Sequence, residues 1–280
     1  DVESMKLIKL DLLGLRMLSA IDDALRDIQA DCGVHVDLDR LPEDLPEVFA
    51  MIGAADTVGV FQIESRAQMQ TLPRSRPETL DDLVVEVAII RPGPIQGNAV
   101  HPYLRRRQGL EPVAYLHPSL EPVLAETLGV ILYQEQVMKI AIEVAGFSAA
   151  ASDGFRRAMG TWRSSREMEK LHRGFVEGCV ATSGLTETEA EELYRQVAGF
   201  ASFGFNKSHA AAFARTAYES AFLKLAYPAQ FTVGLINAQP MGFYPVEVLI
   251  NDAKRHGVAV LPVDLNASRY RSTTEWVGVE

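Results

Sequence analysis

The sequence predicts a mostly α-helical fold with a small β segment at its front edge. Apolar residues recur at three- and four-residue steps in many windows, whereas strict alternation is nearly absent. The first helix is predicted over residues 15–28, and its buried stripe consists of Leu15, Leu18, Ile21, Leu25 and Ile28. Only residues 5–10 and 258–263 have the pattern of short strands.

Helix boundaries follow from capping residues and prolines. Predicted helix starts are Thr79, Ser148, Thr186 and Pro245. Glu189 stands three residues after Thr186, which is the spacing of a capping box. A long helix that begins near Ser208 is predicted to stop at Tyr227, because the next residue is Pro228.

Composition narrows the class of protein. The chain has 280 residues, of which 48% are hydrophobic, so it can bury a core as one large domain or two small ones. No window approaches ~18 uninterrupted apolar residues, and Cys32 and Cys179 are too few for a disulfide framework. We therefore expect a soluble intracellular fragment with reduced, helix-packing thiols. The net charge of −10 does not exclude nucleic acid as a ligand, because it averages over all faces of the molecule.

Lys9 and Asp11 form the first candidate site. They stand two residues apart on the predicted opening strand, so their side chains share one face. A carboxylate suits Mg²⁺ and an ammonium group neutralises phosphate, so the pair fits a metal–phosphate unit. A salt-bridged surface pair is the alternative.

Arg156 and Arg157 form the second candidate site, an anion site. They belong to a run of four arginines in the eleven residues 156–166. Neighbouring residues on a helix diverge by about 100°, so the two guanidinium groups can bind different oxygens of one polyphosphate. The alternative is a solvated basic face that pairs with acidic side chains of the chain itself.

The third candidate covers residues 199–209, where three phenylalanines alternate with small residues before a helix. Small residues permit close backbone approach, aromatic faces stack on bases, and a helix N-terminus attracts anions. The segment therefore fits a surface beneath a nucleobase. An ordinary hydrophobic staple is the alternative.

Several other polar features are interpreted as structural or left open. Residues 91–97 are expected to form a rigid turn. The arginines at 105–107 are expected to be a solvated run in reach of a DNA backbone. Residues 133–136 place polar groups at a predicted strand-to-helix junction, and their role stays open. Asp37 and Asp39 have the spacing of a metal-binding pair but belong to a polar turn. No two histidines stand three or four residues apart, and P-loop, dinucleotide-binding and hydrolase-elbow motifs are absent from the sequence.

Six motifs in order give the chain a family resemblance. They lie at residues 9–15, 60–65, 91–94, 129–136, 156–160 and 204–209. Together they resemble the bacterial C-family DNA polymerases, the family of the α subunit of DNA polymerase III. Residues 65–69, 101–107 and 161–164 look more like the error-prone, damage-tolerant branch than the main replicase.

The resemblance implies a role for each matching residue. Asp11 matches the third carboxylate of a two-metal palm site, and Lys9 matches a lysine that contacts the triphosphate. Arg156 and Arg157 match fingers arginines that hold the incoming dNTP. The surface that faces the nascent base pair matches Gly204, Phe205, Asn206, Lys207, Ser208 and His209.

The resemblance also implies domain boundaries and partners. Residues 1–14 would end the palm, residues 15–262 would form the helical fingers, and residues 263–280 would begin the following linker or domain. The implied ligands are two Mg²⁺ ions, dNTPs and primer-template DNA, in the bacterial cytoplasm at the nucleoid and not at a membrane. A sliding clamp and accessory damage-tolerance proteins would bind regions outside this chain.

An aspartate pair that completes the metal site is expected upstream of Asp11, so this fragment alone is expected to be inactive. Two rival interpretations stay open: a non-catalytic nucleic-acid-binding helical module, which binds through its arginines and phenylalanines, and a structural helical interaction domain.

Overall fold

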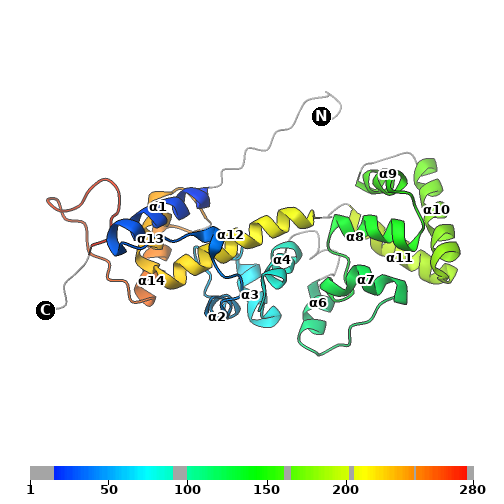
Figure 1. The fold of residues 1–280 in the computed structure, drawn as a ribbon, viewed down its shortest axis with the longest axis horizontal. Coiled ribbons are helices and arrows are strands. Elements are labelled where there is room, and N and C mark those ends of the chain that lie inside the picture. Colours follow the sequence, from blue (N-terminus) through cyan, green and yellow to red (C-terminus); the bar gives the residue numbers. More distant parts are fainter. Residues whose placement is uncertain (1–15, 91–99, 161–164, 202–204, 243, 276–280) are drawn as a thin grey trace, which may run out of the picture. The chain divides into compact units, whose positions relative to one another are not determined.

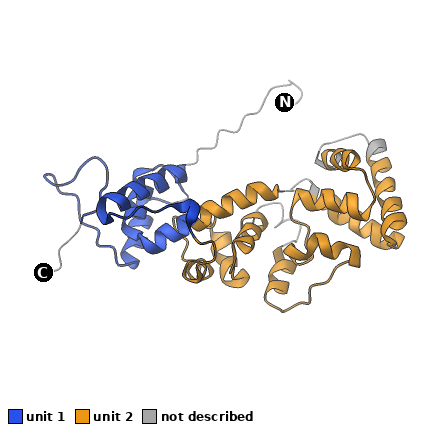
Figure 2. Ribbon diagram, viewed as in Figure 1, with its two compact units in different colours: residues 1–41, 219–280 blue, residues 42–218 orange. Residues whose placement is uncertain are grey.

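The computed structural model describes residues 16–90, 100–160, 165–201, 205–242 and 244–275 (Figure 1). In these ranges the regular elements are helices, and one isolated β-bridge joins Tyr133 to Phe205. The prediction of a mostly α fold is confirmed, whereas the strand predicted over residues 5–10 lies outside the described residues. The chain divides into two compact units (Figure 2), with residues 1–41 and 219–280 in unit 1 and residues 42–218 in unit 2.

Unit 1 combines segments from both ends of the sequence. It contains α1 (Arg16–Cys32), the 3₁₀ turn η1 (Leu38–Arg40), the last turns of α12 (Lys207–Ala226), α13 (Pro228–Asn237) and α14 (Val246–Arg255). Helix α12 ends immediately before Tyr227, as predicted, and Pro228 opens α13 at a position where a missing N–H costs nothing. Pro245 caps α14 from the residue before its first turn.

The buried face of α1 differs from the predicted stripe. Leu18 is 51% exposed, although it was expected in the core. The buried positions are Met17, Ala20, Ile21, Ala24 and Ile28. Helix α13 packs so closely against α1 that a Cβ added to Gly234 would lie 2.4 Å from the carbonyl oxygen of Ala20. This close approach selects small residues on the contact face and displaces leucine from it.

Residues 258–263 do not form the predicted strand. They have no regular secondary structure, and Val263 is 89% exposed. Among the described residues no β-bridge involves this segment, and Pro262 has no N–H to donate. Further along, the Asn237 side chain accepts from the Ser272 N–H and donates to its carbonyl, both at 3.0 Å, which fixes this part of the tail to α13.

The first half of unit 2 is built from short helices. They are α2 (Pro46–Gly53), α3 (Arg66–Ser75), α4 (Leu80–Ile89) and α6 (Val100–Arg107). Thr79 caps α4 in a reciprocal box with Asp82, which confirms the predicted helix start. No helix in the described part of the chain is both long and apolar enough to span a bilayer.

The arginine run at 105–107 is mostly engaged within unit 2. Arg105 is exposed beside Glu111, but Arg106 donates to the Leu128 carbonyl at 2.6 Å. Arg107 lies 2.7 Å from the Asp82 carboxylate and also donates to the Ser75 carbonyl. The expectation of a solvated run is therefore wrong for two of the three arginines, whose guanidinium groups tie α6 to neighbouring turns.

The second half of unit 2 surrounds an aromatic core. Its elements are η2 (Pro118–Leu120), α7 (Glu121–Leu124), η3 (Ala125–Thr127), α8 (Gln134–Lys139), the π-helical turn η4 (Ile140–Val144), α9 (Ala149–Gly160), α10 (Ser165–Ser183) and α11 (Glu187–Ala201). Phe155 stacks on Phe175 with ring centroids 5.2 Å apart, and Phe147 meets Phe155 edge-on at 5.6 Å. Cys179 lies in the same core, and burial raises the pKa of its thiol to about 11. Both cysteines are free thiols, as expected.

Two predicted caps in this half are confirmed. The Ser148 hydroxyl accepts from the Ala151 N–H at 3.2 Å, at the start of α9. The Glu189 carboxylate accepts from the Thr186 N–H at 2.8 Å, and the Thr186 hydroxyl accepts from the Glu189 N–H at 3.2 Å. These caps can be predicted from the sequence because all their partners lie within one turn.

The α1–α13 contact can be tested with Gly234→Ala. The added methyl group meets backbone and not a flexible side chain, so we expect unit 1 to lose about 1–3 kcal/mol of stability. Gly174→Ala, within helix α10, is the matched control, because a Cβ there has nothing within 4 Å. The control should be neutral or stabilising by up to about 1 kcal/mol. Chemical denaturation checks both values, and equal effects of the two substitutions would contradict the close contact.

Glu86 predicts a pH dependence of stability. Its side chain is buried in unit 2 and accepts a hydrogen bond from Thr71 at 2.7 Å, and burial raises its pKa above the ordinary 4.5. Because the folded state then holds this proton more tightly than the unfolded state does, its contribution to stability is full at low pH and is lost as pH rises through the folded pKa.

Glu86→Gln removes this loss. We expect the free energy of unfolding of Glu86→Gln, relative to wild type, to increase when pH is raised from about 4 to about 8. Urea denaturation at several pH values measures the difference. A difference that is constant with pH would show that Glu86 ionises with the same pKa in both states.

Candidate functional site

The described candidate residues all lie in unit 2. These are Arg156, Arg157, Phe205, Asn206, Lys207, Ser208 and His209. Lys9, Asp11, Gly204 and the predicted turn at 91–97 lie outside the described residues, so their interpretation stays a prediction.

Arg156 and Arg157 converge on one carboxylate. Arg156 donates to Asp153 Oδ1 at 3.0 Å, and an Arg157 nitrogen lies 2.6 Å from Asp153 Oδ2. The pairing was one of the two interpretations of this run, and it occurs at the last turns of α9. It also holds the two guanidinium groups near each other, because a single acidic side chain bridges them. Binding of a polyphosphate by these groups remains a prediction.

Two sequence motifs meet at a short backbone bridge. Tyr133 and Phe205 form a parallel β-bridge, and the Gln134 N–H donates to the Phe205 carbonyl at 2.9 Å. Residues 133–136, which had no assigned role, therefore hold the start of the predicted base-facing segment. We call residues 205–209 the 205–209 segment.

The N-terminus of α12 is occupied by the chain itself. Both carboxylate oxygens of Glu135 accept from the Lys207 N–H, at 3.0 and 3.1 Å. The Asn206 side chain accepts from the His209 N–H at 3.0 Å. This helix end was expected to attract an anion, and the anion that it binds is a side chain of the same protein. The Glu135 carboxylate supplies the negative charge.

The side chain of Lys207 is also engaged. Its ammonium group forms an ion pair with Glu126, which lies in η3, and sits 5.8 Å from the centre of the Tyr133 ring. Tyr133 is almost fully buried, and burial raises the pKa of its phenol far above the ordinary value. The ring therefore stays neutral and gives Lys207 a face for a cation–π contact.

A line of ring contacts continues along α12. Phe205 meets His209 at 5.2 Å between ring centroids, His209 meets Phe213 at 4.0 Å, and Phe213 meets Phe61 edge-on at 5.1 Å. Phe205 is half-buried, whereas His209 is exposed. Phe61 belongs to the motif at 60–65, so a third motif of the sequence contacts this row of rings on α12.

The buried side-chain amide of Gln136 fixes the Tyr133 side of the β-bridge. Gln136 Oε1 accepts from the N–H groups of Leu132 and Tyr133, at 2.8 and 2.9 Å. Its Nε2 donates to the Thr127 hydroxyl at 2.8 Å. Because Gln136 is fully buried, these bonds satisfy groups that water does not reach.

Helix α8 links the bridge to the arginines. Helix α9 packs against α8, and the Ser152 hydroxyl donates to the Met138 carbonyl at 3.1 Å. The helix that carries Arg156 and Arg157 and the 205–209 segment therefore rest on one short helix.

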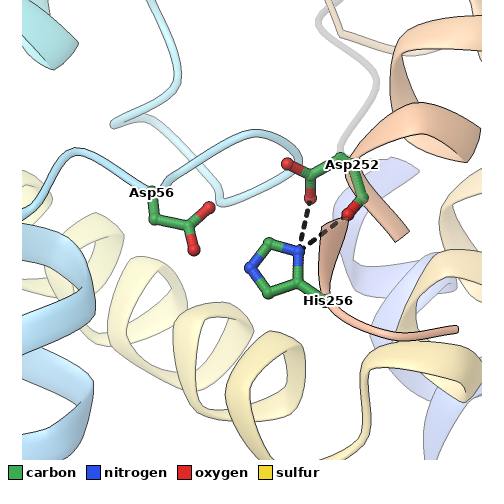
Figure 3. Close-up of side chains that lie close together, drawn as sticks. All are labelled: Asp56, Asp252 and His256. Atoms are coloured by element: carbon green, nitrogen blue, oxygen red, sulfur yellow. Dashed lines mark hydrogen bonds and ion pairs between the residues drawn. The ribbon is translucent and has the colours of Figure 1, made fainter. Parts of the chain in front are cut away.

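Two other acidic groups are explained by local structure. The Asp37 side chain accepts from the Asp39 N–H at 3.1 Å in the turn η1, which agrees with the prediction of a polar turn. Figure 3 shows Asp252 and His256 of unit 1, where the ring Nδ1 lies 2.8 Å from the Asp252 carbonyl. Asp56, also labelled there, belongs to unit 2. The Asp252 carboxylate lies 2.9 Å from the buried Lys224 ammonium group, which compensates its charge.

Sequence reasoning missed the residues that hold the segment in place. Glu135 and Gln136 fell in a motif whose role was left open. No local pattern signals the pairing of Glu126 with Lys207, because the two residues are 81 positions apart.

Comparison with known proteins defines the class of this chain. The family model for the bacterial DNA polymerase III alpha subunit finger domain matches residues 17–183. The chain belongs to this family, which confirms the resemblance drawn from the six motifs.

Curated relatives place it more narrowly. A protein of Corynebacterium jeikeium is 54% identical over 268 residues, which cover 96% of this chain and 23% of that protein. A protein of Mycolicibacterium paratuberculosis is 51% identical over the whole chain and 26% of its own length. A protein of Methylococcus capsulatus is 49% identical over 98% of the chain and 26% of its own length. All three are named error-prone DNA polymerase, and the chain spans about a quarter of their length.

The buried amide network predicts a stability loss for Gln136→Leu. The substitution leaves two backbone N–H groups without their acceptor and removes the hydrogen bond that the Thr127 hydroxyl accepts, so we expect a loss of about 2–4 kcal/mol. Gln196→Leu is the control, because Gln196 is exposed on α11 and bonds Glu192 on the same helix. Its effect should stay within about 0.5 kcal/mol. Denaturant titration of both variants measures the difference, and a mild effect at position 136 would mean that the network adds little.

Proposed function

We propose that this chain is the fingers region, with the edge of the palm, of a DNA-directed DNA polymerase that performs error-prone synthesis across damaged template. In this assignment residues 1–14 end the palm, residues 15–262 form the fingers, and residues 263–280 begin the next linker or domain. Membership of the finger-domain family and relatives named error-prone DNA polymerase support the assignment.

The observation that carries the proposal is the meeting of separate motifs on helix α8. The bridge to Phe205, the cap on Lys207 and the packing of α9 bring the arginine-bearing helix and the 205–209 segment onto one support. A polymerase fingers domain needs such an arrangement, since it holds a triphosphate and senses the shape of a base pair together.

Each residue then has a distinct role. Arg156 and Arg157 bind the triphosphate of the incoming dNTP through charge-assisted hydrogen bonds. The segment from Gly204 to His209 lies against the nascent base pair. In the complete enzyme the primer 3′-hydroxyl attacks the α-phosphate, a new phosphodiester bond forms, and pyrophosphate leaves.

Lys9 and Asp11 belong to the metal side of this reaction. Asp11 would hold Mg²⁺ with an aspartate pair from outside this chain, and its carboxylate oxygens are the donors that Mg²⁺ prefers. Bound divalent ions stabilise the charge on attacking and leaving oxygens. Lys9 would neutralise an oxygen of the triphosphate.

The proposal extends to partners and location. The substrates are dNTPs and primer-template DNA. A sliding clamp and accessory damage-tolerance proteins would bind parts of the protein outside this chain. The place of action is the bacterial cytoplasm at the nucleoid.

Asp11→Ala tests the metal role. In the complete polymerase that carries this chain, we expect primer extension to fall at least ~10³-fold, because one metal loses a ligand at the reacting oxygens. Single-turnover extension measures the rate. Asp37→Ala is the matched control, because that aspartate caps a turn, and it should leave the rate within about twofold of wild type. Extension by Asp11→Ala at near wild-type rates would refute the assignment.

The double variant Arg156→Ala/Arg157→Ala tests the triphosphate role. We expect KM for dNTP to rise by about tenfold or more, while the Kd for primer-template changes little, because each lost contact is a charge-assisted hydrogen bond. Nucleotide titration at fixed DNA and fluorescence anisotropy measure the two quantities.

Asp153→Ala is the control for this pair. It keeps both guanidinium groups and removes the carboxylate that they share. If the arginines serve only to pair with Asp153, the control will reproduce the defect of the double variant. If the double variant instead loses DNA affinity with an unchanged KM for dNTP, the arginines contact template, as a nucleic-acid-binding module requires.

A further inference from the structure

We propose that Glu135 is a positioning residue that sets the 205–209 segment for reading the nascent base pair. The inference rests on the proposed function and adds a residue to it. Glu135 belongs to α8, and its effect on substrate passes through the backbone of the segment that it holds.

The geometry of the contact is specific. The two carboxylate oxygens of Glu135 share the Lys207 N–H, 72 residues away in the sequence. The neighbouring N–H, of Gln134, donates to the Phe205 carbonyl. These two contacts bracket Asn206 from both sides, so the chain enters α12 along a path set by the first turn of α8.

The charge of Glu135 suits this position. A carboxylate at a helix N-terminus is favoured by the helix dipole and by the unpaired N–H groups of the first turn. The Lys207 ammonium group has Glu126 as its partner, so two different acids hold the backbone and the side chain of one residue. Loss of Glu135 therefore frees the backbone while the side-chain ion pair can persist.

A second acid in unit 2 provides a matched comparison. Glu189 accepts from the Thr186 N–H at the start of α11, as Glu135 accepts at the start of α12. Both substitutions to alanine remove a carboxylate from a helix N-terminus, but the Glu189 cap is local and no candidate residue lies beside it in sequence. A loss that comes only from weaker helix capping will be similar in both variants.

The experiment compares Glu135→Ala, Glu135→Gln and Glu189→Ala in the complete polymerase. For Glu135→Ala we expect kcat/KM for the correct dNTP to fall about tenfold or more, since small displacements of positioning groups have large kinetic effects. The ratio of incorrect to correct insertion should rise, and the Kd for primer-template should stay within about twofold. Glu135→Gln should recover most of kcat/KM, because one amide oxygen can accept from the Lys207 N–H.

Glu189→Ala should leave kcat/KM and the insertion ratio at wild-type values. The proposal is overturned if Glu135→Ala has wild-type kinetics, if Glu189→Ala gives an equal defect, or if Glu135→Gln is as impaired as Glu135→Ala.

Hydrogen exchange separates this proposal from the proposed function. Glu135→Ala should raise amide exchange at Lys207 and the following turn of α12 at least about tenfold, with no change at α11. Absence of template-directed incorporation by the wild-type protein would refute the proposed function, while this exchange pattern would still support the positioning of the segment. Unchanged exchange would overturn the positioning itself.

Discussion

The structure of the candidate site depends on the contact between the first turn of α8 and the start of α12. The Tyr133–Phe205 bridge and the Glu135–Lys207 bond join residues separated by more than 70 positions. These backbone contacts fix the Phe205 carbonyl and the first turn of α12 against α8, and the arginine-bearing helix α9 packs on the same α8. Charge favours the contact, because a carboxylate meets the positive end of a 20-residue helix.

Helix α8 can act as a support because its own surroundings leave it little freedom. Gln136 satisfies the backbone before it, and the π-helical turn η4 continues it into the aromatic core around Phe155 and Phe175. Ser152 then ties α9 back to α8. Polar groups that are buried and satisfied resist displacement, since any movement would leave them without water or partner.

The sequence could predict what is decided locally. The caps at Thr79, Ser148 and Thr186 and the end of α12 depend on partners within one turn, and all are confirmed. The prediction of the buried face of α1 was partly wrong because this face depends on Gly234, which lies far away in the sequence on α13. The strand predicted at 258–263 was wrong because an alternating pattern of apolar residues does not by itself supply a neighbouring strand to pair with.

The candidate site shows the same division. Motif order identified the family and singled out Arg156, Arg157 and the 205–209 segment. It did not reveal that Asp153 joins the two arginines, or that Glu135 fills the anion position at the N-terminus of α12. The Asp153 pairs are local, three and four residues apart on α9, and the motif comparison did not use that spacing. The Glu135 contact spans 72 residues, so it is set by tertiary packing and has no local pattern.

The most direct test of the account is a structure of the complete polymerase with primer-template, dNTP and Mg²⁺ bound. We expect the guanidinium groups of Arg156 and Arg157 within hydrogen-bond distance of the triphosphate, and the 205–209 segment against the nascent base pair. The proposal would be contradicted by a structure in which both arginines still pair with Asp153 and point away from the nucleotide, while the 205–209 segment lies on another face of the protein.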